Sequence, residues 1–225
     1  MKPAWARRSQ GMHFLYRVVL FLAWLYCKIC YRNRVYGNEF PLQGGAIIAS
    51  NHTSFLDPIL LSISWPEEVH FLARESLFKI LGFGAFIRAL NAHPVSGDAG
   101  DVAVFRSVIS LMKEGKKVIL FPEGTRSHEN KLGLIKPGIG LLISRSNAAI
   151  IPAYIHGSYN IWSRKRKFPK LWGKTACVFG APIEYSAFAH LDKREAQAAI
   201  AEKLSEAIFS LRAWYEAGAK GALPV

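Results

Sequence analysis

A histidine and an aspartate that could act together in proton transfer, His52 and Asp57, directly follow the apolar run Ala46–Ser50. A neutral imidazole can take a proton from an attacking hydroxyl, and a nearby carboxylate can fix the tautomer of the imidazole and stabilise the imidazolium that forms. The same spacing recurs at His93 and Asp98. The spacing alone therefore does not choose between the two histidines.

A second candidate site is the block Phe-Pro-Glu-Gly-Thr-Arg-Ser at residues 121–127, which comes at the end of the apolar run 117–121. Loops at the carboxyl ends of strands are where α/β proteins bind ligands. Gly124 permits a close approach of the backbone, Thr125 offers a hydroxyl, and Arg126 offers a planar donor fork that suits phosphate. On these residues alone, a phosphate site and a plain turn with a helix cap and a solvated arginine both remain open.

Together these residues resemble the glycerolipid acyltransferase family. The family's first motif, Asn-His-x-x-x-x-Asp, is matched by Asn51, His52 and Asp57, and its Phe-Pro-Glu-Gly-Thr-Arg-Ser block is matched residue for residue. A further family block, an apolar strand containing proline, is similar to residues 150–155. The resemblance covers residues 34–185 or thereabouts.

The resemblance also assigns roles. In the family the base lies well upstream of the Glu-Gly-Thr-Arg block, which selects His52 over His93, and for His93 we expect only a place at the end of a short strand. His52 is expected to act as general base with Asp57 orienting it. The family's later block implies that four consecutive residues position the phosphate of the acceptor: Glu123, Gly124, Thr125 and Arg126.

The reaction that the resemblance implies is direct transfer of an acyl group from a thioester to the free hydroxyl of 1-acylglycerol 3-phosphate (lysophosphatidic acid), which gives phosphatidic acid in phospholipid biosynthesis. The thioester is that of coenzyme A or of an acyl carrier protein, and we expect no permanently bound cofactor and no metal. The absence of a Gly-x-Ser-x-Gly motif fits a reaction without a covalent acyl-enzyme.

One position departs from the family. Its middle block usually carries an arginine where this chain has Gly97, so a phosphate contact is missing or displaced. Arg88 or Arg106 could replace it, and each is equally well a surface cation. Other acceptors therefore stay open: glycerol 3-phosphate, a lysophospholipid or a lyso-aminolipid. A noncatalytic membrane-binding protein is disfavoured, because His52 and Asp57 are both retained.

Composition and charge indicate a globular chain with an anionic partner. The chain has 225 residues, of which 51% are hydrophobic, and this suits one domain with a real core. A formal net charge of +13 favours nucleic acid, a phospholipid surface or an acidic carrier. Three cysteines leave an odd thiol, so we expect a reducing setting and no structural disulfide.

The N-terminal segment combines basic and apolar residues. Residues 1–38 contain no acidic residue, and their longest uninterrupted apolar run, 18–27, spans only about 15 Å as a helix, half of a hydrocarbon core of about 30 Å. We expect residues 1–33 to form a membrane-docking helix in the plane of the interface, monotopic rather than spanning, on the cytoplasmic face. Cys27 and Cys30 are expected to be small residues facing lipid or core.

The elements that must position the two candidate sites alternate along the chain. Apolar runs predict buried strands at 46–50, 69–73, 117–121 and 149–155, and apolar periodicity predicts helices at 101–114 and from Asp192 onward. This alternation indicates an α/β domain, and the family resemblance implies a mixed central sheet flanked by helices. We expect the acyltransferase domain to cover 34–216 and a loose tail to cover 217–225.

The segment from Trp162 to Lys174 interleaves six cations with aromatic residues. This pattern suits a lipid headgroup surface, an acidic carrier protein or nucleic acid, and it is also compatible with a solvated loop. Because no nucleic-acid-binding fold accompanies the charge, nucleic acid is not expected as a partner. With an apolar helix in the same chain, contact with a phospholipid surface is the favoured interpretation.

Overall fold

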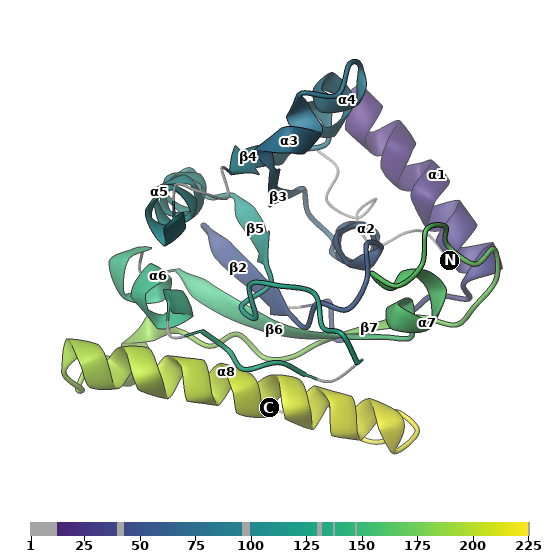
Figure 1. Cartoon of the computed structure of the whole chain (residues 1–225). Helices are drawn as coiled ribbons and strands as arrows, with labels where there is room; N and C mark the ends of the chain where they lie inside the picture. Colours follow the sequence, from purple (N-terminus) through teal and green to yellow (C-terminus); the bar gives the residue numbers. More distant parts are fainter. Residues whose placement is uncertain are drawn as a thin grey trace.

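A seven-stranded sheet forms the centre of the protein in the computed structural model, which describes residues 13–39, 43–95, 100–129, 132–136, 138–146 and 148–224. Its strands run in the order β1-β7-β6-β2-β5-β3-β4 (Figure 1). β6 and β7 are antiparallel, and the other neighbouring pairs are parallel. The strands are β1 (Arg34–Tyr36), β2 (Ala46–Ser50), β3 (Val69–Arg74), β4 (Ala92–Val95), β5 (Lys117–Leu120), β6 (Ala149–His156) and β7 (Ala176–Phe179). The predicted α/β fold with a mixed sheet is confirmed.

Strand β2 lies at the centre of the sheet and all five of its residues are buried. A strand covered on both faces reads as a continuous apolar run, which is what Ala-Ile-Ile-Ala-Ser provides. Because successive side chains point to opposite faces, Ile48 joins the hydrophobic cluster on one side of the sheet and Ile47 joins the cluster on the other. The strand that leads into His52 is thus fixed from both sides.

Helices cover both faces of this sheet, as Figure 1 shows. α1 and α2 pack on one face, and α5, α6 and α8 pack on the other. The helices are α1 (Phe14–Cys30), α2 (Asp57–Ser64), α3 (Glu75–Phe78), α4 (Phe83–Ala89), α5 (Gly100–Lys113), α6 (Gly138–Ser146), α7 (Ser158–Trp162) and α8 (Lys193–Glu216), with a 3₁₀ turn η2 at Tyr185–Phe188.

The ends of the two predicted helices follow local chemistry. Gly115 adopts φ +76° just after α5, and the N–H of Lys116 bonds to the carbonyl of Leu111, so the chain leaves the helix through a left-handed glycine. At the start of α8, Asp192 Oδ1 accepts hydrogen bonds from the N–H groups of Arg194 and Glu195, at 2.8 and 2.9 Å.

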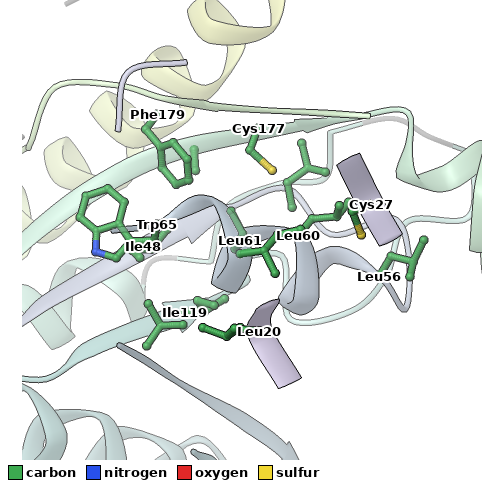
Figure 2. Close-up of a cluster of buried hydrophobic side chains, with 14 of the residues drawn as sticks. Leu20, Cys27, Ile48, Leu56, Leu60, Leu61, Trp65, Ile119, Cys177 and Phe179 are labelled. Carbon is green, nitrogen blue, oxygen red and sulfur yellow. The ribbon is translucent and has the colours of Figure 1, made fainter. Parts of the chain in front are cut away.

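Helix α1 belongs to the hydrophobic core along one side. Tyr16, Leu20 and Cys27 are buried, and Figure 2 shows Leu20 and Cys27 in the cluster of side chains around α2. Cys27, Cys30 and Cys177 are free thiols, and burial raises the pKa of Cys27 to about 12. Among the described residues, no helix combines the length and the apolar character that crossing a bilayer requires. Residues 1–12 of the predicted docking segment lie outside the described part.

The other side of α1 is exposed and apolar. Phe14, Val18, Leu22, Leu25 and Ile29 recur at intervals of three or four residues, so they form one stripe along the helix. Phe14 is 80% exposed, and Leu22 and Ile29 are each 58% exposed. One stripe of α1 thus completes the core and the opposite stripe remains uncovered.

The segment after α8, which was predicted to be a loose tail, packs against the domain through Leu223. Leu223 packs against a small cluster that contains Tyr36, Val178 and Leu211. Residue 225 lies outside the described part of the chain.

Candidate active site

The two candidate motifs lie side by side because the strands that precede them are neighbours. β2 and β5 are parallel, with Ala49 opposite Leu120. The loops that follow them therefore leave the same edge of the sheet, the edge where parallel α/β sheets bind ligands. His52 and Glu123 are 71 residues apart in the sequence, and the sheet brings them into contact.

His52 and Asp57 form a hydrogen-bonded pair. The Nδ1 atom of His52 lies 2.9 Å from Oδ2 of Asp57, and the same oxygen accepts hydrogen bonds from the N–H groups of Thr53 and Ser54, each at 2.7 Å. Asp57 is fully buried, whereas the His52 side chain is 18% exposed. With Nδ1 directed at the carboxylate, Nε2 on the opposite edge of the ring is the nitrogen left for a substrate proton.

Asn51 fixes the peptide that leads into His52. Its side-chain amide donates to the carbonyl of Ile155 at 3.0 Å, and its Oδ1 accepts from the N–H of Ile155 at 2.8 Å. This pair of bonds continues the pairing of β2 with β6 beyond the end of β2 through a side chain. Asn51 therefore acts on the site by holding backbone.

The backbone of His52 is held by the second motif. Its N–H donates to Oε1 of Glu123 at 2.9 Å, and its carbonyl accepts from the N–H of Ser127 at 2.8 Å. The other oxygen of Glu123 accepts from the N–H of Gly133 at 3.1 Å. Burial raises the pKa of Glu123, and these two N–H groups oppose the shift. Glu123 thus uses both oxygens on backbone groups, and any effect on a bound phosphate passes through the loops it joins.

Phe121 supports the imidazole ring from one face. The ring centroids of His52 and Phe121 are 3.8 Å apart and the planes differ by 13°. An aromatic ring stacked this closely restricts rotation of the imidazole about its side-chain bonds. The bond to Asp57 and the Phe121 stack together define the direction in which Nε2 points.

The turn after Phe121 presents the remaining predicted residues. The N–H of Gly124 bonds to the carbonyl of Phe121 at 2.9 Å, and Gly124 has φ +75°, a conformation that favours glycine. Arg126 lies over the ring of Phe55, with its central carbon 3.6 Å from the ring centroid. Its Nη1 is buried and has no hydrogen-bond partner among the described residues. The guanidinium is thus held in place with donor capacity left for a ligand.

A cavity of about 300 Å³ joins these groups. Its lining includes His52, Phe121, Gly124, Thr125 and Arg126, together with Arg74 and Arg164. No acidic side chain, serine or cysteine is among the described residues that line it. The cavity therefore offers a histidine and several cations, and Thr125 carries the one hydroxyl among the described residues that line it.

His93 lies elsewhere in the sheet. It is in β4, and its Nε2 is 3.0 Å from Nδ1 of His70. Its sequence partner Asp98 and the divergent Gly97 fall outside the described residues. Arg88 stacks over Phe78, and Arg106 is exposed on α5.

Sequence analysis missed two groups at the site: Arg164, which lines the cavity, and Phe55, which supports Arg126. Arg164 belongs to the basic segment that was interpreted as a membrane or carrier surface, and Phe55 lies inside the first motif at a position that the motif leaves open. The neighbouring sequence does not identify either residue, because each reaches the site only through the tertiary structure. The cation excess of the segment at 164–174 was the one available indication.

A histidine paired with aspartate, beside a cationic cavity at the carboxyl edge of a mixed α/β sheet, is an arrangement that can take a proton from a hydroxyl. Comparison with known proteins agrees with this chemistry. The family profile described as Acyltransferase matches residues 32–156, which is more than half of the chain. The chain belongs to the acyltransferase family, as the two motifs predicted.

Relatives with assigned activities are similar over most of the chain. A 1-acyl-sn-glycerol-3-phosphate acyltransferase of Bacillus subtilis is 32% identical over 79% of this chain and 87% of its own length. The chloroplastic LPAT1 enzyme of Arabidopsis thaliana is 28% identical over 71% of this chain and 45% of its own length. Among solved structures, the 1-acyl-sn-glycerophosphate acyltransferase PlsC of Thermotoga maritima matches with a TM-score of 0.72 and 25% identity, covering 92% of this chain and 83% of that one.

Proposed function

We propose that this protein transfers an acyl chain from an acyl thioester to the free hydroxyl of 1-acylglycerol 3-phosphate, giving phosphatidic acid. The observation that carries the proposal is the 2.9 Å pairing of His52 with Asp57 at the edge of a cavity that Thr125 and Arg126 also line. Relatives that carry this activity by name match most of the chain. Acyl transfer to a phosphate-bearing acceptor needs both a base and a cation, and the cavity holds both.

In the proposed reaction, Nε2 of His52 takes the proton of the acceptor hydroxyl as its oxygen attacks the thioester carbonyl. Asp57 holds the tautomer in which Nε2 is free and stabilises the imidazolium. The tetrahedral species then collapses, the carbon–sulfur bond breaks, and the proton passes from His52 to the leaving sulfur. The products are an ester and a free thiol, and the base returns to its starting state.

The acceptor phosphate is assigned to the turn at 124–126. Gly124 lets the backbone approach closely, Thr125 supplies a hydroxyl, and Arg126 supplies a fixed guanidinium. Glu123 contributes by joining this turn to the backbone of His52. We assign the donor to the class of acyl thioesters, coenzyme A or an acyl carrier protein, since the family reaction needs one.

The docking surface that we propose for the membrane consists of the outward stripe of α1 and the exposed residues 165–172. Phe168, Leu171 and Trp172 are all more than 60% exposed, and Tyr26 of α1 donates to the carbonyl of Leu171 at 3.4 Å. Figure 1 shows α1 along one side of the molecule, with α4 near one end and the loop after α7 near the other. Apolar side chains flanked by lysine and arginine suit an anionic lipid surface.

We place this docking on the cytoplasmic face of the membrane, with α1 lying in the plane of the interface. The three free cysteines fit a reducing compartment. The 17 residues of α1 provide about 25 Å of helix, and one side of that helix is already occupied by the core.

The test is a panel of acceptors in mixed micelles, with thiol release from an acyl-coenzyme A or an acyl carrier protein as the readout. We expect release that depends on 1-acylglycerol 3-phosphate and falls by at least about 100-fold in His52→Ala, because the base is lost. His93→Gln serves as the matched control and retains most of the activity, since His93 bonds to His70 outside the cavity.

Two results would overturn the proposal. Full activity in His52→Ala would reject His52 as the general base. Thiol release that requires a different acceptor and ignores 1-acylglycerol 3-phosphate would keep the reaction class and reject the substrate.

A further inference from the structure

Arg164 enters the active-site cavity from a segment that carries no family motif. It lies two residues beyond α7, at the start of the basic segment, and it lines the cavity together with His52 and Thr125. Its Nη1 donates to Nε2 of His128 at 2.7 Å and lies 3.4 Å from the carbonyl of Arg126. Arg164 is therefore attached to the loop of the second motif, 38 residues away in sequence from Arg126.

Three arginines share this cavity without a carboxylate in its lining. They are Arg74 at the end of β3, Arg126 and Arg164. Burial, and then the charges of Arg164 and Arg74, lower the pKa of Arg126, while Asp57 acts in the opposite direction. Asp57 is one carboxylate against three guanidinium groups, and it is already bonded to His52 and to two backbone N–H groups, so the cluster keeps an excess of positive charge. Like charges held this close favour an anion between them.

The charge of the proposed ligand supplies a second reason to look for a further cation here. A phosphate monoester carries close to two negative charges at neutral pH, so one arginine does not match it. A second guanidinium beside Arg126 would balance that charge.

We propose that Arg164 is a specificity-determining residue that binds the acceptor phosphate together with Arg126, an inference that rests on the proposed function. It makes the enzyme select acceptors that carry a phosphate monoester over uncharged lyso-lipids. The loop that carries it is docked on α1, through the Tyr31 hydroxyl to the Lys170 carbonyl and the Gly173 N–H to the Cys30 carbonyl, both at 3.0 Å. The phosphate is thus bound beside the surface at which the lipid arrives.

The first experiment compares R164Q with R145Q in micelles of an uncharged detergent, where attraction to anionic lipid is absent. Both variants remove the charge of one exposed arginine, but Arg145 lies on α6, outside the cavity and outside the proposed docking surface. We expect R164Q to raise the KM for 1-acylglycerol 3-phosphate about 10-fold or more, as for loss of a charged hydrogen bond, with kcat nearly unchanged. R164K keeps the charge but lacks the planar fork, so we expect its KM to lie between those of the unaltered protein and R164Q.

Selectivity gives the decisive readout. With 1-monoacylglycerol as acceptor, R164Q and the unaltered protein should have the same KM, because this acceptor has no phosphate to bind. R145Q should change the KM of both acceptors by less than about 2-fold, as expected for an exposed charge. An equal effect of R164Q and R145Q on 1-acylglycerol 3-phosphate, or an equal effect of R164Q on both acceptors, would overturn the assignment.

A binding measurement separates this inference from the proposed function. Glycerol 3-phosphate is titrated calorimetrically into His52→Ala protein with and without R164Q, with glycerol as the uncharged control. We expect saturable binding that R164Q weakens about 10-fold, whatever lyso-lipid the enzyme acylates. Absence of binding in the His52→Ala parent, or equal binding in both proteins, would reject the phosphate role of Arg164. Thermal melts check that both proteins are folded.

Discussion

The carboxylate of Glu123 accepts a hydrogen bond from the backbone N–H of His52 at 2.9 Å, so the second motif acts on the base through the main chain. Its other oxygen accepts from the N–H of Gly133. A carboxylate in this position joins two loops, and it does not offer a free oxygen to substrate. Placed directly against a phosphate, it would repel that phosphate.

Glu123→Gln tests this role. A glutamine has one acceptor oxygen, so its amide group would face one of the two backbone N–H donors, and the peptide of His52 would shift. We expect kcat to fall about 10-fold, within the range set by a misplaced base, while the KM for 1-acylglycerol 3-phosphate changes less than about 3-fold. Steady-state kinetics measure both constants.

The control for Glu123→Gln is Glu202→Gln, the same change at an exposed position of α8. It should leave both constants unaltered. A large rise in KM with unchanged kcat in Glu123→Gln would place the carboxylate in contact with substrate and contradict the structure.

Phe55 determines how firmly Arg126 is held. The guanidinium lies 3.6 Å from the centroid of the Phe55 ring, and Trp162 contacts the same ring at 5.1 Å between centroids. A cation over an aromatic face is worth about 0.5–1 kcal/mol at an exposed site. Phe55→Leu should therefore raise the KM for 1-acylglycerol 3-phosphate about 2- to 5-fold without changing kcat.

A matched control exists for Phe55→Leu in the same chain. Arg88 lies over Phe78 at 4.7 Å, away from the cavity, so Phe78→Leu removes the same kind of contact without touching the site. Its KM should equal that of the unaltered protein. If both variants raise KM to the same degree, the effect comes from a general loss of packing and not from the contact between Phe55 and Arg126.

Strands and motifs were accessible from sequence for local reasons. The strands at 46–50 and 117–120 are short apolar runs, and the two motifs follow them directly. That these strands are neighbours is not a local property, because β3 and β4 lie between them in the chain. The contact of Glu123 with the backbone of His52 depends on that neighbourhood, so residue types alone could not indicate it.

The N-terminal helix shows a different limit. Its sequence is apolar nearly all round, which predicted an interfacial helix but not which side would be free. Tyr16, Leu20 and Cys27 pack into the core because α2 and the sheet present an apolar face to them, and this face is assembled from distant segments. The position of Arg164 in the cavity could not be predicted from local sequence either, because its partners Arg126 and His128 belong to another loop.

This arrangement of α1 changes the test of membrane docking. Deleting residues 1–33 would remove buried side chains as well as exposed ones. Replacing Phe14, Leu22 and Ile29 by glutamine alters the exposed stripe alone. At about 25 cal/mol per Å² of apolar area, we expect binding to anionic vesicles to weaken at least about 10-fold in cosedimentation, with the melting temperature unaltered.

The reverse pattern is expected at a buried position of the same helix. Leu20→Ala should lower the free energy of unfolding by about 2–4 kcal/mol, because it leaves a cavity, and should leave vesicle binding of the folded protein intact. Unchanged sedimentation of the triple glutamine variant would assign docking to residues 165–172.

The pair of His70 and His93 predicts a loss of stability in mild acid. Burial, and then the charges of His93 and Lys116, lower the pKa of His70 from 6.5 to about 4, and burial lowers the pKa of His93 as well. The bond between Nδ1 of His70 and Nε2 of His93, at 3.0 Å, needs one acceptor nitrogen, and protonation of both rings removes it.

The unfolded chain binds a proton at residue 70 more readily than the folded protein does, and this sets the direction in which stability depends on pH. Between pH 6.5 and pH 4 the unfolded chain binds a proton at residue 70 and the folded protein does not, so the free energy of unfolding falls as the pH is lowered through this window. The contribution is fully present above pH 6.5. Urea titrations at pH 7 and pH 5 should show that the unaltered protein loses about 1 kcal/mol more stability than His70→Asn, which cannot titrate. His190→Asn, at an exposed position, should keep the full dependence, and an equal loss in His70→Asn would show that other groups cause it.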